Sequence, residues 1–387
     1  MARDPVQSRT QSRSLEEIRE LFPITKDLVY FDHASTGPMT APARKAIEEC
    51  IDVYTRRAQF DFSAYFSKLA RCRLTVARLI GAEPEEIAFV TNTSEGVYIA
   101  LINIPLRPDD KVLVMDEVFP TVRYVTDYNI PQAQKIYVPM CGRDPVDALH
   151  PHVDNNVKAV VIDLVQFATG EMVDLPRLSA FLDENDISLV VDGMQAIGSL
   201  NMKVSDANID FLACGASKWL FCPNGIGFLY VNQKKFGTLN KLHTGWLGAS
   251  WKSFEDFAVN PPLFEDARMF EQGTRNVIGI SALSANCKLL HDQGLVNVEN
   301  RIQQVKTALR KGLGNMGYDI LTPASGRQSG IITARPDRMK HHDVRQLYDS
   351  LKDNKIVVSL RNQAIRFSPH FYNTTEEVNI ILDILKK

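Results

Sequence analysis

Two charged side chains near the middle of the chain, Asp192 and Lys218, are placed for chemistry. Each lies at or just past the end of a segment that we expect to be a strand. In an open α/β sheet the reactive groups gather at the carboxyl ends of the strands, so both side chains could point into one crevice. Lys218 follows the small residues 214–217, where partial desolvation would lower its pKa and free the amine to condense with an aldehyde.

Asp192 needs a partner, because a carboxylate buried alone costs several kcal/mol. A pyridinium nitrogen is such a partner, and a lysine bonded to an aldehyde with an Asp at the pyridine nitrogen is the pairing that holds pyridoxal phosphate. The alternative is that Asp192 caps a helix and Lys218 lies at the surface, which would suit any single Asp or Lys.

A second group of polar residues, Thr93, Ser94 and Glu95, follows the expected strand 87–91 and precedes the helical run 96–103. A helix N-terminus offers unpaired N–H groups and the positive end of the helix dipole, which suits a phosphate. A simple helix cap would explain the same residues.

The elements that must position these residues are short β-branched runs that alternate with helical stretches. This alternation, with strands apolar on both faces, predicts an α/β core with a mainly parallel sheet over residues 15–272. The expected strands are residues 111–115, 158–163, 188–192, 211–214 and 227–231.

Beyond residue 273 the pattern changes, and a smaller α+β domain is predicted over residues 273–387. It begins with a long helical stretch, 278–316, and continues with strands near 329–334, 356 and 364 and a helix near 343–354. The last helix is expected to begin at Thr374, where Thr-Thr-Glu-Glu supplies a cap and acidic residues in the first turn. Residues 1–14, rich in Arg, Ser and Gln, are expected to be a mobile leader, with a transit peptide as the alternative.

Composition favours small-molecule chemistry. The 387 residues carry a formal net charge of -2 without a dense block of either sign, which argues against nucleic acid as a partner. No apolar run approaches the length needed to span a membrane, so we expect a cytoplasmic protein. The six cysteines and eight histidines show no spacing typical of metal ligands, and no metal site is predicted.

Six blocks of the sequence, spread over nearly the whole chain, resemble the class V aminotransferases. This group of fold type I pyridoxal-phosphate enzymes includes cysteine desulfurases, kynureninase and isopenicillin N epimerase-like proteins. The resemblance implies a large domain with a mainly parallel sheet between helices and a smaller C-terminal α+β domain, against which the N-terminal segment is expected to pack. The blocks are residues 30–38, 91–96, 191–195, 217–219, 271–276 and 366–374.

The resemblance also implies roles for single residues. Lys218 would hold pyridoxal 5'-phosphate as an internal aldimine and later move protons at the α-carbon of the substrate. Asp192 would keep the ring nitrogen protonated, and Gln195 would donate to the phenolic oxygen, unless it is simply a polar residue at a helix start. Ser217 would add a hydroxyl to the phosphate site that Thr93, Ser94 and Glu95 are expected to form.

Phe119 and Thr274 occupy two further positions of the family pattern. Phe119 would stack on the cofactor ring where cysteine desulfurases have a histidine; a phenylalanine cannot shuttle a proton, and packing in the core is its alternative role. Thr274 matches a segment that reaches the partner's phosphate, which implies a homodimer with shared active sites.

Arg366 matches the arginine that receives the substrate's α-carboxylate, a role that suits its planar fork of donors. Arg361 and Arg275 are the nearby candidates, and a surface salt bridge is the alternative for each. The side-chain pocket is expected to include residues 33–35, with His33 and Ser35, together with Phe119 and the loop around Trp246.

The reaction itself is less determined than the cofactor. Persulfide-forming cysteine desulfurases need a cysteine shortly before the substrate arginine, and residues 288–387 contain none. We therefore expect an enzyme that transforms an α-amino acid through an external aldimine, with transamination favoured over a cysteine desulfurase-like C–S lyase or an epimerase. A non-catalytic binding module is a remote alternative, and a nicotinamide dehydrogenase lacks its GxGxxG motif.

Overall fold

The computed structural model describes residues 13–57, 61–251, 261–326, 328–336 and 343–386. Its larger part is built on a sheet in the order β2-β8-β7-β6-β5-β3-β4. Neighbouring strands run parallel except at β8, which is antiparallel to both β2 and β7. The strands are β2 (Ile87–Val90), β3 (Lys111–Met115), β4 (Gln134–Val138), β5 (Val157–Asp163), β6 (Ser188–Asp192), β7 (Phe211–Gly215) and β8 (Gly227–Val231).

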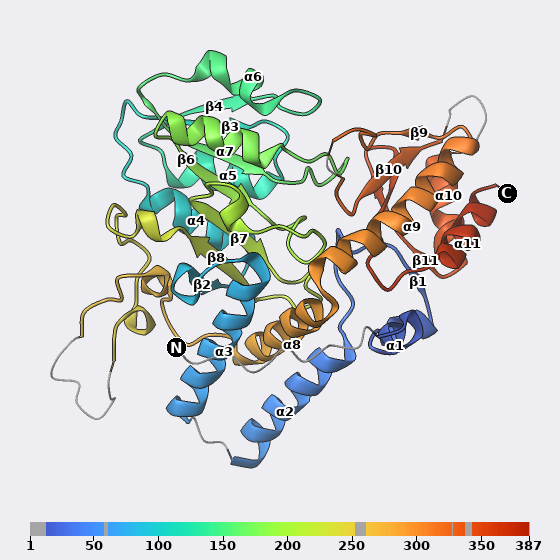
Figure 1. Ribbon diagram of the computed structural model, residues 1–387, viewed down its shortest axis with the longest axis horizontal. Helices are drawn as coiled ribbons and strands as arrows, with labels where there is room; N and C mark the ends of the chain where they lie inside the picture. The colour runs from blue at the N-terminus through green and yellow to red at the C-terminus, as the bar shows by residue number, and fades with distance from the viewer. Residues whose placement is uncertain (1–12, 58–60, 252–260, 327, 337–342, 387) are drawn as a thin grey trace, which may run out of the picture.

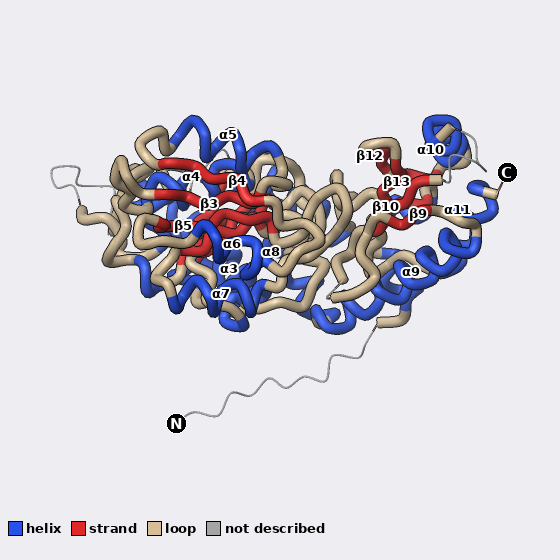
Figure 2. The backbone as a smooth tube through the Cα atoms, turned by 90° about the horizontal axis from the view of Figure 1, so that it is seen from above, coloured by secondary structure: helices blue, strands red, loops and turns tan. Residues whose placement is uncertain are grey.

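Helices lie on both faces of this sheet (Figure 2), which explains why its central strands are buried along their whole length. The predicted mainly parallel α/β architecture is therefore confirmed. Helices α2 and α3 pack against α8, and α4 packs against α5, β7 and β8. The helices of this part are α2 (Ala41–Arg57), α3 (Phe62–Ile80), α4 (Thr93–Asn103), α5 (Pro120–Asn129), α6 (Pro145–Leu149), α7 (Leu175–Glu184) and α8 (Val277–Gln293).

A smaller antiparallel sheet, in the order β12-β13-β10-β9, lies with the C-terminal helices at the other end of the molecule (Figure 1). Next to it, β1 near the N-terminus pairs in parallel with β11 near the C-terminus, and α1 precedes β1. These elements are α1 (Leu15–Glu20), β1 (Val29–Tyr30), α9 (Leu295–Asn315), β9 (Asp319–Ile320), β10 (Ile332–Arg335), α10 (Val344–Asp353), β11 (Ile356–Val357), β12 (Ser359–Arg361), β13 (Ala364–Phe367) and α11 (Thr375–Leu385).

The two parts have separate hydrophobic cores that meet along α9. Val298 and Ile302 of this helix belong to the large core, whereas Val305, Leu309 and Leu313 belong to the small one. The single helical stretch expected over 278–316 is wrong in one respect, because Gly294 ends α8 with a φ of 76° and α9 begins after it. The cap expected at Thr374 is confirmed, since its side chain accepts from the N–H of Glu377.

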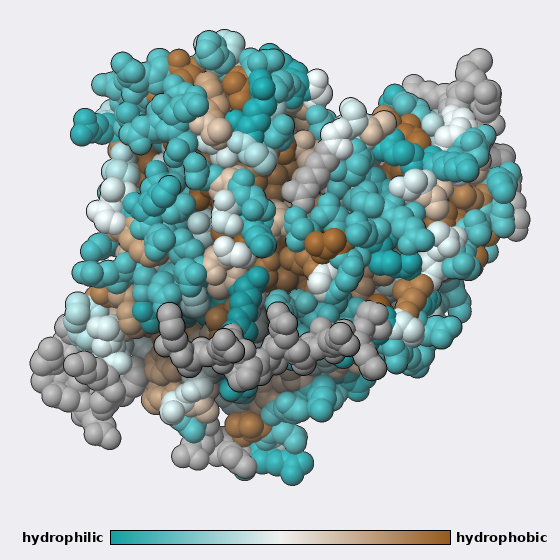
Figure 3. All heavy atoms as spheres, viewed as in Figure 1, coloured by the Kyte–Doolittle hydropathy of each residue, from teal (hydrophilic) through white to brown (hydrophobic). Residues whose placement is uncertain are grey.

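Short 3-10 helices join the main elements. They are Pro23–Lys26, Pro84–Glu86, His150–His152, Val204–Asp206, Gln233–Lys235, Trp246–Gly248 and Ala267–Phe270. Within the described part of the chain, no helix is long and apolar enough to cross a membrane. The face shown in Figure 3 is largely hydrophilic, with small hydrophobic areas between the large and the small part.

Candidate active site

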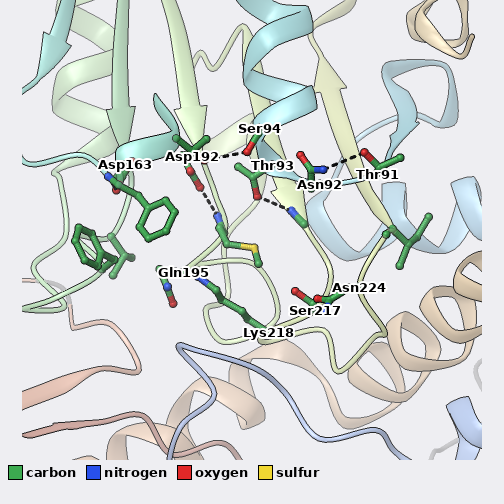
Figure 4. Close-up of a pocket in the computed structure, with 18 residues that line it drawn as sticks. Thr91, Asn92, Thr93, Ser94, Asp163, Asp192, Gln195, Ser217, Lys218 and Asn224 are labelled. Carbon is green, nitrogen blue, oxygen red and sulfur yellow. Dashed lines mark hydrogen bonds between the residues drawn. The ribbon is translucent and has the colours of Figure 1, made fainter. Parts of the chain in front are cut away.

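The carboxyl ends of β3, β5, β6 and β7 meet at one edge of the large sheet, where the chain places its polar side chains. Asp163 ends β5 and Asp192 ends β6, and the two are register partners on adjacent parallel strands. Their side chains line a cavity of about 390 Å³ together with Lys218 (Figure 4). The other lining residues are Thr91, Asn92, Thr93, Ser94, Phe119, Thr121, Val165, Phe167, Met194, Gln195, Gly215, Ser217, Asn224, Gly225 and Ile226.

Lys218 lies in the turn that follows β7, and this turn is held by a segment distant in sequence. The N–H of Gly37 donates to the carbonyl oxygen of Ser217 at 2.8 Å. A Cβ at position 37 would lie 2.0 Å from the carbonyl oxygen of Lys218, so only glycine fits there. The Lys218 amine lies 5.5 Å from the centre of the Phe119 ring. Burial lowers the pKa of Lys218 to about 8, although the negative charge of Asp192 opposes the shift.

The two carboxyl groups opposite this lysine are difficult to ionise. Burial raises the pKa of Asp192 to about 6, although its Oδ1 accepts a hydrogen bond from the Met194 N–H at 2.8 Å. Burial, and then the neighbouring charge of Asp192, raise the pKa of Asp163 well above its usual value. Asp163 Oδ2 accepts from the Phe119 N–H at 2.7 Å, whereas its Oδ1 is buried without a hydrogen-bond partner among the described residues.

The N-terminus of α4 forms a third side of the cavity. Asn92 caps this helix by accepting from the Glu95 N–H at 2.9 Å. Thr93 Oγ1 accepts from the Gly215 N–H at 2.9 Å, which ties the helix to the end of β7, and Ser94 Oγ lies 2.9 Å from Thr121 Oγ1. These residues leave the first turn of the helix facing the cavity, as an anion site requires.

Glu95 is outside the cavity lining, unlike the two residues before it. Its carboxylate accepts from the backbone and hydroxyl of Thr91 and pairs with His243 at 3.3 Å. Burial opposes ionisation, but the hydrogen bonds from His243 and Thr91 lower the pKa of Glu95 to about 2. Its side chain therefore secures the start of α4 from outside the cavity.

Gln195 lines the cavity and also joins three segments of the chain. Its Nε2 donates to the Ala34 carbonyl at 3.0 Å, and its Oε1 accepts from Trp219 Nε1 at 2.8 Å. One amide hydrogen of Gln195 is thus committed to the protein, and the other is available for an acceptor in the cavity.

Arg366 lies beside the cavity without lining it. Its Nη1 donates at 2.6 Å to the carbonyl oxygen of Phe167, whose ring is part of the cavity wall. Its Nη2 donates to Ser35 Oγ at 2.7 Å and lies 3.5 Å from Asp32 Oδ1, while its Nε is buried and has no partner within the described ranges. Burial lowers the pKa of Arg366 to about 10. Arg361 reaches the same hydroxyl of Ser35 at 3.3 Å.

His33 and Thr274 are not among the residues that line this cavity. His33 is completely buried, with its ring nitrogens 2.7 Å from the Ser368 carbonyl oxygen and 2.9 Å from the Tyr372 hydroxyl. Burial lowers its pKa to about 3, so the ring is neutral and joins the turn after β1 to the C-terminal segment. Next to Thr274, the N–H of Arg275 donates to the Tyr65 hydroxyl at 2.6 Å.

Several lining residues were not singled out from the sequence, and Asp163 is the most important of them. Its signal was the same as that of Asp192, a carboxylate directly after an apolar strand. Phe167 carried no local signal, because its place in the wall depends on an edge-to-face contact with Phe119 at 5.2 Å. Asn92 directly precedes the predicted Thr93 and caps the same helix, whereas Asn224 lies in a segment that the sequence analysis did not single out.

The donor set fits the group expected from the sequence. An amine with a lowered pKa suits an aldehyde, a buried carboxylate suits a ring cation, and a helix N-terminus suits a phosphate. The Oδ1 of Asp163 is a buried polar atom at this cavity that no described residue satisfies.

Comparison with known proteins identifies the family of this chain. A family model described as "Aminotransferase class-V" matches residues 29–381. An uncharacterized aminotransferase, YcbU, of Bacillus subtilis is 24% identical over 95% of this chain and 96% of its own length. A probable cysteine desulfurase of Pyrococcus abyssi is 25% identical over 96% of this chain and 97% of its own.

Solved structures share the fold. A mutant of the protein C-DES, with glycine covalently linked to the PLP cofactor, superimposes with a TM-score of 0.86 at 22% identity, covering 95% of this chain and 98% of that one. At this level of identity the likeness concerns the fold.

Proposed function

This chain belongs to the class V aminotransferase family, and we propose that it transforms an α-amino acid in the cavity around Lys218. Its cofactor is pyridoxal 5'-phosphate, the cofactor of this family. When bound, this group supplies an electron sink that allows bonds at the α-carbon of an amino acid to be broken. The observation that carries the proposal is the amine of Lys218 in one cavity with the buried carboxyl of Asp192.

Lys218 has two tasks in this proposal, covalent attachment of the cofactor and movement of a proton at the substrate's α-carbon. Both need a neutral amine for part of the cycle. The lowered pKa of Lys218, about 8, makes that form accessible near neutral pH. Asp192, as the ionised member of the carboxyl pair, would hold a proton on the ring nitrogen.

The remaining predicted residues would orient the cofactor. The N–H groups of Thr93 and Ser94, with the hydroxyl of Ser217, would hold the phosphate at the start of α4. Glu95, whose own N–H donates to Asn92, would secure this first turn. The free amide hydrogen of Gln195 would reach the phenolic oxygen. Phe119 would support one face of the cofactor ring, since its aromatic ring lies next to the Lys218 amine.

Arg366 would receive the α-carboxylate, with Arg361 as a second cation beside it. Two observations support this assignment: the buried Nε of Arg366 has no partner in the part of the chain that the structure describes, and both arginines contact the hydroxyl of Ser35. A carboxylate arriving here would compete with Asp32 for the guanidinium, so binding would exchange one ionic contact for another.

Transamination is the reaction that we favour. All six cysteines lie in the described ranges and none of them lines the cavity, which argues against a persulfide carried on the enzyme. Elimination of a β-substituent or epimerisation would need no thiol, and the products distinguish them from transamination.

We also propose the larger setting of the site. The active form would be a homodimer in which Thr274 serves the partner's phosphate site, and the location would be cytoplasmic. The division of the chain near residue 273 into a large and a small domain, preceded by a leader over residues 1–14, stays a prediction; most of that leader lies outside the described residues.

The test begins with the absorption spectrum of the purified holoenzyme and reduction by borohydride, followed by peptide mapping. Label should appear at Lys218 and vanish in Lys218→Ala, while the exposed-lysine control Lys288→Ala should behave like the native protein. An adduct that persists in Lys218→Ala would refute the assignment of the lysine.

The same holoenzyme is then screened with α-amino acids, with and without a 2-oxo acid as amino acceptor. Formation of a new amino acid from the acceptor supports transamination. Release of ammonia with a 2-oxo acid would instead indicate β-elimination, and loss of chirality alone would indicate epimerisation.

A further inference from the structure

Asp163 is a second buried carboxyl group in the cavity, beyond the single carboxyl that a ring cation requires. It is the last residue of β5, and 3% of it is exposed. Because Asp163 and Asp192 are register partners on adjacent parallel strands, their side chains leave the sheet close to each other. Both line the cavity shown in Figure 4.

The two oxygens of Asp163 have different surroundings. Oδ2 accepts a hydrogen bond from the backbone N–H of Phe119 at 2.7 Å. Oδ1 is buried and has no hydrogen-bond partner in the described part of the chain. An oxygen that is removed from water and left without a partner is costly, so a bound group that satisfies it would gain affinity.

The charges around Asp163 favour its neutral form. The negative charge of Asp192 on β6 opposes ionisation of Asp163. The thiol of Cys141, after β4, carries no positive charge that could compensate. Among the described residues, the favourable charge that acts on Asp163 is that of Lys218, after β7. Two buried carboxyls side by side do not both ionise readily. The proton is expected on Asp163, because its Oδ1 is buried and has no hydrogen-bond partner among the described residues.

We propose that Asp163 is a neutral carboxylic acid whose Oδ1 hydroxyl donates a hydrogen bond to an acceptor atom of the bound cofactor. The inference rests on the proposed function, because it assigns a donor in the same cavity. Asp192 and Asp163 then divide the work: the first is an anion for the ring nitrogen, and the second is a neutral donor. Burial beside a like charge is the physical means by which two identical side chains acquire opposite roles.

Infrared spectroscopy of the apoprotein tests the protonation state without the cofactor. A difference spectrum between native protein and Asp163→Asn at pH 7 should contain the band of a protonated carboxyl group. In Asp192→Asn, where the like charge is gone, this band should disappear at a lower pH than in the native protein. Absence of the band at pH 7 would overturn the inference, even if the enzyme binds pyridoxal phosphate as proposed.

Cofactor affinity tests the donor role. Asparagine keeps an acceptor for the Phe119 N–H and a neutral donor for the cavity, so Asp163→Asn should bind pyridoxal phosphate within about threefold of the native protein at pH 7. Asp163→Ala should bind about tenfold more weakly, as expected for the loss of one buried hydrogen bond.

The decisive comparison is between pH values below and above the pH at which the infrared band of Asp163 disappears. Native affinity should fall relative to that of Asp163→Asn as the pH rises, because the acid loses its proton and the amide does not. Equal pH dependence of the two proteins would overturn the donor role, and so would an Asp163→Asn protein as weak as Asp163→Ala at pH 7. Failure of all three proteins to bind the cofactor would refute the proposed function, while the infrared result would still report the state of Asp163.

Discussion

Lys218 and the two carboxyls near it respond to the same burial in opposite directions. Removal from water disfavours the charged form of every group, so the lysine becomes easier to deprotonate and the carboxyls become harder to ionise. The attraction between Lys218 and Asp192 partly offsets both shifts. A neutral amine and a retained proton can therefore exist together near neutral pH.

The shifted pKa of Lys218 predicts the pH dependence of cofactor attachment. Only the neutral amine attacks an aldehyde, so attachment to the apoprotein should accelerate as the pH rises and level off above a midpoint at about pH 8. The rate is followed by stopped-flow absorbance after mixing with pyridoxal phosphate. A midpoint near the ordinary lysine value of 10.5 would contradict the burial argument.

Asp192 predicts a pH-dependent contribution to the stability of the apoprotein. Its pKa is higher in the folded protein, about 6, than the ordinary 3.8, so the folded state binds an extra proton between these values. The stabilisation that this group contributes to the folded apoprotein is therefore lost as the pH rises from about 4 through 6. Urea unfolding over this range should show that native stability falls relative to Asp192→Asn. Parallel curves for the two proteins would contradict the raised pKa.

Arg366 predicts a selective effect on carboxylate substrates. Replacement by lysine removes the bidentate contact, and a hydrogen bond to a charged group is commonly worth about 1.5–3 kcal/mol. Arg366→Lys should raise KM and lower kcat for α-amino acids, while the absorption spectrum of the cofactor stays unchanged. Amines without a carboxylate are the control and should be nearly indifferent to the substitution. Unchanged kinetics with α-amino acids would move the carboxylate site to Arg361 or Arg275.

At the scale of elements, the loop after β5 connects the two cores. Four consecutive carbonyl oxygens, those of residues 167–170, each accept a hydrogen bond from a side chain of the C-terminal part. Since Phe167 lines the cavity, the position of the small sheet is linked to one wall of the site. The donors are, in the order of the carbonyls, Arg366, Thr333, Thr322 and Ser329.

Thr333 offers a direct test of this connection. Thr333→Val keeps the shape of the side chain but leaves the Ala168 carbonyl without its donor, which should lower the free energy of unfolding by about 1–3 kcal/mol. Thr307→Val, at an exposed position of α9, is the matched control and should change stability by less than about 0.5 kcal/mol. Denaturant unfolding measures both. Equal effects of the two changes would show that the hydrogen bond contributes little.

At the scale of the whole molecule, the proposed dimer predicts that two impaired variants can restore activity when their subunits combine. If Thr274 completes the partner's site, Lys218→Ala and Thr274→Ala subunits are each impaired, but a mixed dimer contains one site with both native residues. Mixing the two variants should restore about a quarter of native activity when subunits exchange at random, since half of the dimers are mixed and each has one intact site of two.

Sedimentation of the holoenzyme and activity after mixing provide the measurements. Native protein that is fully active as a monomer would refute the shared site. If the protein is a dimer but mixing the two variants restores no activity, the proposed dimer stands and the role of Thr274 in the partner's site is refuted.

All the described strands of the large sheet except β4, and their reactive ends, could be predicted because their signals are local. A short apolar run followed by a polar residue marks Asp192 wherever the strand lies in the sheet, and the small residues before Lys218 mark its turn. The cap at Thr374 was found for the same reason, since all its partners lie within one turn of helix.

Strand register and burial decided the rest, because they depend on contacts between distant segments. Register brought Asp163 beside Asp192, and packing of the small sheet brought Arg366 to Phe167. Burial made His33 a neutral link between two segments, a role that the sequence does not distinguish from that of a histidine in a substrate pocket. Local patterns thus identify which side chains are reactive, whereas the fold determines which neighbours they meet and therefore which protonation states they adopt.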